Sequence, residues 1–143
     1  MNLFNHFLIG EKVYTQFLSP VFEKHNLTYM ELTVLLFLAN NPTLDTASHI
    51  VKCRNLSKSH VSMSVRSLTE KGLLEGMYQD GDRRAVHLKP TQLADEIIAE
   101  GREAQRAFMN VVFSGFTPEE LKTLSLLIEK TDKNIAEYSD SHR

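Results

Sequence analysis

The side chains in this chain that are best suited to binding a ligand are short hydroxyl groups and cations, which cluster in residues 58–66. They are Lys58, Ser59, His60, Ser62, Met63 and Arg66. At helical spacing the serines, Lys58, Met63 and Arg66 share one face, with His60 beside them. Small hydroxyl side chains let a helix approach a groove closely, and Lys and Arg donate hydrogen bonds to phosphates or base edges. This face predicts binding to DNA.

A helix that presents this face is expected from Ser57 to just before Gly72. The Ser57 hydroxyl can cap a free backbone N–H group of the first turn, and Gly72 tolerates the positive φ that follows a helix. A single apolar stripe lies opposite the polar face and comprises Val61, Val65 and Leu68. The helix should therefore pack on one side and expose the other, and Ser57 is expected to face the major groove of DNA together with the polar face.

Two short strands should follow, one over residues 73–79 and one over residues 85–88. Between them Asp80-Gly81 is a strong signal for a tight turn. The tip of this hairpin is expected to carry Arg83 and Arg84 beyond the protein surface, where a narrow, negative minor groove could receive them. Asp82 beside them could orient one guanidinium through paired hydrogen bonds.

Two helices are expected before the polar helix. Thr28 and Glu31 spell a capping box for a helix that ends before residues 40–42. A shorter helix should run from about residue 44 to Arg54, and the two helices around the turn at residues 55–56 make a helix-turn-helix. In that arrangement Lys52 and Arg54 would lie close to the DNA backbone.

Helix, glycine, strand, Asp-Gly-Asp-Arg-Arg turn and strand together resemble the winged helix-turn-helix of the MarR family of bacterial transcriptional regulators. Family members carry Asp-x-Arg in the wing, then Leu-Thr and a long helix. Asp82, Arg84 and Thr91 match this pattern, while Pro90 replaces the usual Leu and Met63 stands where many members have Arg. The resemblance covers nearly the whole chain and implies a ligand-responsive repressor that binds a pseudo-palindromic operator.

Both ends of the chain should be amphipathic helices. The first spans residues 3–24 and contains Pro20, which could kink it or end it early. A long helix opens at Pro90-Thr91, and a last helix follows the capping box at residues 117–120. The apolar first helix lies at a chain terminus, where few residues of its own domain can cover it. Pairing with a second copy would cover it, so residues 1–25 and 91–140 would together form a helical dimerisation region.

The expected fold is mainly α-helical with a small β-hairpin wing, in a single domain of 143 residues. Within it, residues 28–89 would form the DNA-binding lobe. The net charge of −2 is distributed unevenly: residues 52–89 hold eight Lys or Arg against four Asp or Glu, a net charge of +4, which leaves −6 elsewhere. Basic charge is thus concentrated where DNA binding is predicted.

The family resemblance also implies a small aromatic or anionic effector bound between the dimerisation region and the DNA-binding lobe. Weak candidates for its binding site are Phe17, Phe22, His25 and Tyr29, each of which fits a core or surface role better.

Cys53 has no second cysteine to resolve an oxidised state, and an ordinary, partly buried thiol is favoured.

Other functions are less well supported. The six histidines form no closely spaced ligand pair, so neither metal nor cofactor is expected. The sequence contains neither a phosphate-binding loop nor a nucleophile motif, so an enzyme is not expected. With no membrane-spanning run or signal segment, a cytoplasmic protein is expected. The alternative is a winged helix that binds an acidic protein partner through Arg83 and Arg84 instead of DNA.

Overall fold

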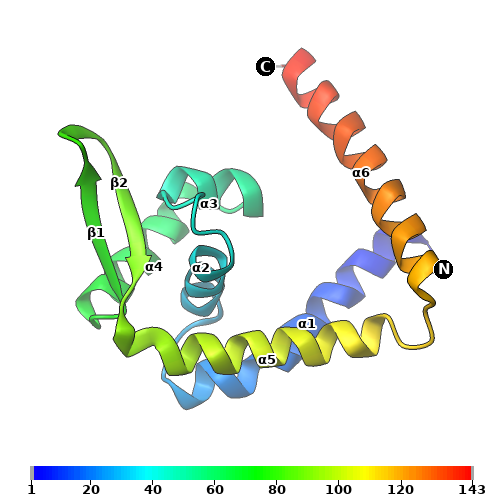
Figure 1. The fold of residues 1–143 in the computed structure, drawn as a ribbon, viewed down its shortest axis with the longest axis horizontal. Coiled ribbons are helices and arrows are strands. Elements are labelled where there is room, and N and C mark those ends of the chain that lie inside the picture. Colours follow the sequence, from blue (N-terminus) through cyan, green and yellow to red (C-terminus); the bar gives the residue numbers. More distant parts are fainter. Residues whose placement is uncertain (1, 143) are drawn as a thin grey trace. The chain divides into compact units, whose positions relative to one another are not determined.

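The computed structural model describes residues 2–142 and is mainly helical, with one two-stranded antiparallel hairpin. Figure 1 shows its elements along the chain: α1 (Leu3–Lys24), α2 (Tyr29–Asn40), α3 (Ala47–Arg54), α4 (Lys58–Glu70), β1 (Leu74–Gln79), β2 (Asp82–Pro90), the 3-10 helix η1 (Gln92–Ala94), α5 (Asp95–Val112) and α6 (Pro118–Ser141). They fall into two compact units, one ending at Phe108 and one beginning at Met109. The predicted fold class is confirmed.

The core of the first unit is built around α2, whose residues 31–38 are all buried. Leu18 of α1, Ile50 of α3 and Leu68 of α4 are fully buried against this cluster. Because this buried segment of α2 covers about two turns of the helix, the other elements of the unit pack around it on all sides. The hairpin projects beside α4 at the edge of this core (Figure 1).

Helix starts follow the caps expected from the sequence. Thr28 and Glu31 form a complete capping box at α2, and the Ser57 hydroxyl accepts a hydrogen bond from the His60 N–H at α4. The third helix begins later than expected, at Ala47, because Thr46 caps it. Helix α4 ends at Glu70, and Gly72 takes a φ of +76° in the left-handed region.

The segment after the hairpin differs from the expectation of a helix opening at Pro90-Thr91. Strand β2 extends to Pro90, and Thr91 remains extended while its hydroxyl donates a 2.6 Å hydrogen bond to the Gly72 carbonyl oxygen. One 3-10 turn then precedes α5, which starts at Asp95. Pairing with β1 thus holds this segment extended, and the long helix begins five residues later than the sequence pattern indicates.

Two residues that could have interrupted helices do not. Pro20 lies inside α1, which continues to Lys24. Gly101 lies within α5 against Leu36 of α2, where a Cβ atom would come within 2.7 Å of the leucine side chain. The glycine therefore allows α5 to pack closely on α2.

The second unit contains the end of α5 and the whole of α6. Thr117, Pro118 and Glu120 form the expected capping box with proline in the first turn. No residue of α6 is buried within the chain, although it carries an apolar stripe that includes Leu121, Leu127, Ile128, Ile135 and Tyr138. Across residues 2–142, no helix is both long and apolar enough to cross a membrane.

Candidate nucleic-acid interface

Helix α4 buries one face and exposes the other, as its sequence predicts. Val61, Ser64 and Leu68 are buried against the core, and Val65 is half-buried. The exposed face holds every side chain expected there: Lys58, Ser59, His60, Ser62, Met63 and Arg66. Ser57 caps the same end of the helix, so its hydroxyl is already engaged with the His60 backbone N–H group at 3.2 Å.

A buried carboxylate attaches α4 to α2. Glu31 is 4 % exposed, and its Oε2 atom accepts hydrogen bonds from Ser67 Oγ at 2.9 Å and Lys71 Nζ at 3.0 Å. Its other oxygen accepts the Thr28 backbone N–H. Burial alone would raise the pKa of Glu31, but the hydrogen bonds from Thr28, Lys71 and Ser67 outweigh it and the pKa is lowered.

The hairpin turns tightly at Asp80 and Gly81, whose φ values of +48° and +77° lie in the left-handed region. Gln79 pairs directly with Asp82, so Arg83 and Arg84 belong to β2 rather than to the loop. The expectation that both arginines sit on the hairpin tip is therefore wrong in detail: they occupy the first strand positions beside the turn. Both are exposed there.

The two arginines are oriented by different neighbours. The Nε and Nη2 atoms of Arg84 donate hydrogen bonds of 3.0 and 3.1 Å to the two oxygens of Asp82, which also accepts the Arg84 backbone N–H. These bonds lower the pKa of Asp82 and raise that of Arg84. The Arg83 guanidinium lies 5.7 Å from the centre of the Tyr78 ring. The paired hydrogen bonds expected of Asp82 are thus present, with Arg84 as the partner.

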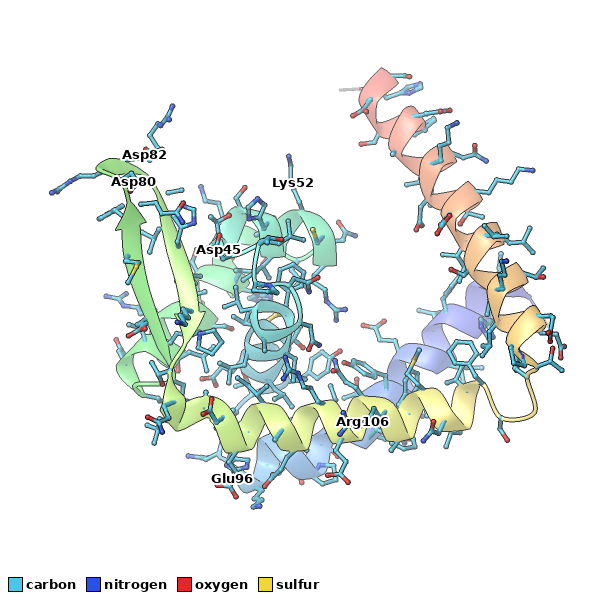
Figure 2. The ribbon with its side chains drawn as sticks, in the orientation of Figure 1. Asp45, Lys52, Asp80, Asp82, Glu96 and Arg106 are labelled. Atoms are coloured by element: carbon cyan, nitrogen blue, oxygen red, sulfur yellow. The ribbon has the colours of Figure 1, made fainter. Side chains whose placement is uncertain are left out.

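The hairpin is joined to the helix-turn-helix through Asp45. Its Oδ1 atom lies 2.9 Å from His87 Nδ1, and its backbone carbonyl oxygen accepts a 2.7 Å hydrogen bond from the Leu88 N–H. Both contacts connect β2 to the residues just before α3. The wing is therefore fixed relative to α3 and α4 within the first unit, and Lys52 on α3 points in the direction in which the hairpin projects (Figure 2).

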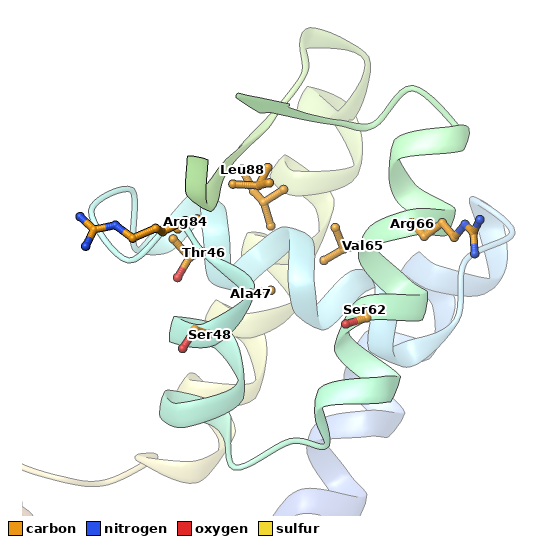
Figure 3. A pocket seen from close by; sticks show the side chains of 10 residues that line it. Thr46, Ala47, Ser48, Ser62, Val65, Arg66, Arg84 and Leu88 are labelled. Atoms are coloured by element: carbon orange, nitrogen blue, oxygen red, sulfur yellow. The ribbon is translucent and has the colours of Figure 1, made fainter. Parts of the chain in front are cut away.

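A groove of about 430 Å³ separates α4 from the wing (Figure 3). Its walls are Thr46, Ala47 and Ser48 at the start of α3, Ser62, Val65 and Arg66 of α4, and residues 84–86 and Leu88 of β2. In Figure 3 the Arg66 and Arg84 side chains extend away from the groove in opposite directions. A smaller hollow of about 260 Å³ lies between α3 and α4, where Lys52 and Lys58 are close to Ser48 and Ser62.

Arg54, the last residue of α3, is exposed but lines neither the groove nor the hollow. It lines a polar cavity of about 90 Å³ with Tyr14 of α1, Thr33 and Asn40 of α2, and Gln105 of α5. Within residues 2–142, Thr33 Oγ1 is the buried side-chain oxygen or nitrogen that has no hydrogen-bond partner. Arg54 therefore belongs to the cavity wall, whereas Lys52 belongs to the hollow between α3 and α4.

The residues suggested for effector binding do not line that polar cavity. Phe22 and Tyr29 pack edge to face, with ring centres 6.2 Å apart, against the core. Phe17 contacts the Phe108 ring, and His25 Nε2 lies 2.9 Å from a Glu100 carboxylate oxygen. Cys53 is exposed on α3, so the expectation of a partly buried thiol is wrong. Nowhere in residues 2–142 do three potential metal ligands cluster.

Sequence reasoning missed several residues that shape this surface. Lys71, Asp45, His87 and Thr33 carried no recognisable signal, because their partners or cavity walls lie on other elements. Glu31 was identified as a capping residue of α2. Its second role, accepting a hydrogen bond from Ser67 of α4, was missed because Ser67 lies 36 positions away in the sequence. A carboxylate inside an otherwise apolar helix was the one signal that could have indicated a buried partner.

Comparison with known proteins agrees with this geometry. Residues 25–85, which include α2, α3, α4 and most of the hairpin, match the MarR family. The match extends over 61 of the 143 residues, and over this segment the chain is similar to the MarR family. The match contains the exposed face of α4 and the Asp82 and Arg84 pair.

Solved MarR proteins share the fold at low sequence identity. A putative MarR family transcriptional regulator from Listeria monocytogenes, in complex with 26mer DNA, has a TM-score of 0.84 at 17% identity, over 96% of this chain and 91% of that one. A MarR protein from Peptoclostridium difficile has a TM-score of 0.78 at 19% identity, over 99% of this chain and 91% of that one. Staphylococcus aureus MarR, in complex with salicylate and kanamycin, has a TM-score of 0.72 at 20% identity, over 94% of this chain and 90% of that one.

Proposed function

We propose that this protein, like the regulators of the MarR family, binds duplex DNA sequence-specifically, with α4 in the major groove and the wing in the adjacent minor groove. The observation that carries the proposal is the combination, within one unit, of the exposed polar face of α4 and an Arg84 side chain held outward by Asp82. A narrow minor groove attracts such an arginine. The Listeria relative, solved in complex with 26mer DNA, supports DNA binding by this fold.

The DNA contacts divide by type. Lys58, Ser59, His60, Ser62, Met63 and Arg66 would face base edges and nearby phosphates, and Ser57 would remain the helix cap. Lys52, beside Lys58 in the hollow between α3 and α4, suits a phosphate oxygen. The Arg83 and Arg84 side chains would enter the minor groove, while Arg54 lines the polar cavity described above. Residues 28–89 would thus act as the DNA-binding lobe.

The active form would be a homodimer that binds a pseudo-palindromic operator. Exposed apolar side chains on both terminal helices support this, namely Leu3, Phe7, Leu8 and Ile9 on α1 and the stripe on α6. Such faces are stabilised by pairing with a second copy, so residues 1–25 and 91–140 would form the dimerisation region. Two lobes would then meet half-sites about 34 Å apart. A dimer covering that length would act as a repressor by excluding polymerase.

The polar cavity lined by Arg54 and Thr33 would hold a small anionic effector. Arg54 supplies positive charge, and the Tyr14 hydroxyl and the Gln105 amide supply hydrogen-bonding groups at its wall. Thr33 Oγ1 has hydrogen-bonding capacity that no described residue uses, which is costly for a buried hydroxyl. The Staphylococcus aureus relative, solved with salicylate and kanamycin, supports small-molecule binding by this fold, and salicylate is an anion.

Replacing Thr33 by valine tests the effector site separately from DNA binding. Because Thr33 Oγ1 makes no hydrogen bond within residues 2–142, the variant should unfold at the same or a slightly higher urea concentration than wild type. Its response to effectors found by screening small carboxylates for release of DNA should be lost. A wild-type response in Thr33→Val, or a destabilised variant, would contradict this assignment.

The test of the main proposal is selection of bound sites from a random duplex pool, followed by titration of the selected duplex. Wild-type protein should bind it with an affinity that falls steeply with salt, because phosphate contacts release counterions. Arg84→Ala should bind about tenfold more weakly. Arg106→Ala removes an exposed arginine of α5 and should have no such effect. If no duplex is enriched, and an acidic protein competes instead, the DNA-binding proposal fails.

A further inference from the structure

Met63 is an anomaly on the proposed DNA-reading surface. Its side chain is 67 % exposed, and it is the only large apolar side chain exposed between Tyr29 and Glu70, all of which the structure describes. The other large apolar side chains of α2, α3 and α4 are buried or half-buried in the core. Most of the Met63 side chain is therefore free to contact whatever binds the exposed face of α4.

The position of Met63 on α4 places it at the middle of the exposed face. Ser59 lies one turn before it and Arg66 lies three residues after it, so the three side chains form a continuous row along the helix. The buried residues Val61, Ser64 and Leu68 lie on the opposite side of the helix. Any groove that accepts α4 along this face therefore meets Met63 together with Ser59 and Arg66.

The chemistry of the row indicates which base feature each residue can recognise. Serine and arginine offer hydrogen bonds to the donor and acceptor edges of bases, and arginine suits guanine. The Met63 side chain is flexible and apolar, and its thioether is at most a weak acceptor. Among groups exposed in the major groove, the apolar one is the C5-methyl group of thymine.

We propose that Met63 reads a thymine methyl group, so that each operator half-site contains an A·T pair at the position facing the middle of α4. This inference rests on the proposed DNA-binding function and adds a specific base to it. The neighbouring Ser59 and Arg66 side chains would contact the flanking base pairs. Discrimination arises because removing the methyl group leaves the methionine in contact with water or a polar base edge.

The experiment replaces each thymine of the selected duplex, one at a time, by deoxyuridine, which lacks only the methyl group. For wild-type protein, one position in each half-site should show a loss of affinity of about fourfold, the size expected for one buried methyl group. For Met63→Ala the same replacement should cause no further loss, because the group that contacts the methyl is already gone. Fluorescence anisotropy at fixed salt gives both values.

Met109→Ala is the matched control, since Met109 is also exposed, at 49 %, but lies on α5 in the second unit. It should retain the wild-type pattern of sensitivity to deoxyuridine. The inference is overturned if no thymine is sensitive, or if the sensitive thymine stays sensitive in Met63→Ala. Those results would leave DNA binding itself intact, whereas failure to select any duplex would remove the proposed function and this inference together.

Discussion

Arg84 and Asp82 are the residues on which the proposed minor-groove contact depends. A free arginine side chain loses several rotatable bonds on binding, and paired hydrogen bonds to a carboxylate restrict those bonds in advance. Asp82 has a cost, because its negative charge also faces the phosphates. The Asp82 carboxyl group is charged at neutral pH even at its ordinary pKa of 3.8, and the hydrogen bonds from Arg84 lower that pKa further. Orientation must therefore outweigh repulsion if the pair assists binding.

Substitutions at these two positions separate orientation from charge. Arg84→Ala should weaken binding to the selected duplex about tenfold, and Asp82→Ala should weaken it by a smaller factor. The double variant should bind no more weakly than Arg84→Ala alone, since Asp82 acts through that arginine. Titrations at fixed salt measure all three affinities. Tighter binding by Asp82→Ala would show that repulsion dominates and that Asp82 does not orient Arg84 for DNA.

At the scale of elements, α4 is held at its C-terminal half by the hydrogen bonds from Ser67 and Lys71 to Glu31. The wing is held separately, through Asp45, next to the start of α3. The two attachments leave the exposed face of α4 and the groove beside it clear. Part-buried polar contacts below the proposed DNA-facing surface thus fix the angle between the two elements that would enter neighbouring grooves.

Glu31→Gln tests the attachment of α4. A glutamine keeps the shape but loses the charge and one acceptor, so the free energy of unfolding should fall by about 1 to 3 kcal/mol in urea titrations at pH 7. Because the folded pKa of Glu31 lies below its ordinary value of 4.5, its stabilisation is present above that value and is lost as pH falls through the folded pKa. The difference from wild type should shrink accordingly.

Glu75→Gln, at an exposed position of β1, is the control and should change stability little at any pH. A Glu31→Gln protein as stable as wild type at pH 7 would show that the buried carboxylate is not part of the attachment. A deficit that persists unchanged at pH 3 would show that its charge is irrelevant.

The sequence predicts the helices well where local chemistry sets their ends. Thr28, Ser57 and Thr117 cap helices by bonds within four residues, and these starts were found. The start of the long helix was misplaced, because pairing of β2 with β1 extends the chain to Pro90. The exposed face of α4 was found from periodicity alone. The partners of Glu31 and the polar cavity were not, because they form only when distant elements pack.

At the scale of the whole molecule, the proposed function requires two copies. Helix α6 has an apolar stripe but no buried residue within its own chain, which is an unstable arrangement for an isolated helix in water. Its stripe and the apolar residues at the start of α1 together account for much of the exposed apolar surface away from the DNA-binding lobe. Pairing of copies would bury both.

Two adjacent leucines of α6 provide a matched test of pairing. Leu127 and Leu126 are 56 % and 57 % exposed, but helical geometry places Leu127 on the stripe and Leu126 on the opposite side. Leu127→Asp should shift the protein towards monomer in sedimentation velocity at micromolar concentration and weaken operator binding. Leu126→Asp should do neither. A wild-type protein that is already monomeric, or equal effects of the two variants, would contradict the proposed dimer.

The most direct measurement of the central claim is a footprint of the selected duplex, with hydroxyl radicals for the minor groove and dimethyl sulfate for guanine N7 in the major groove. Wild-type protein should protect both grooves in each half-site. Arg84→Ala, at a concentration that saturates the duplex, should lose the minor-groove protection and keep that of the major groove. Minor-groove protection that persists without the Arg84 side chain would contradict the placement of the wing.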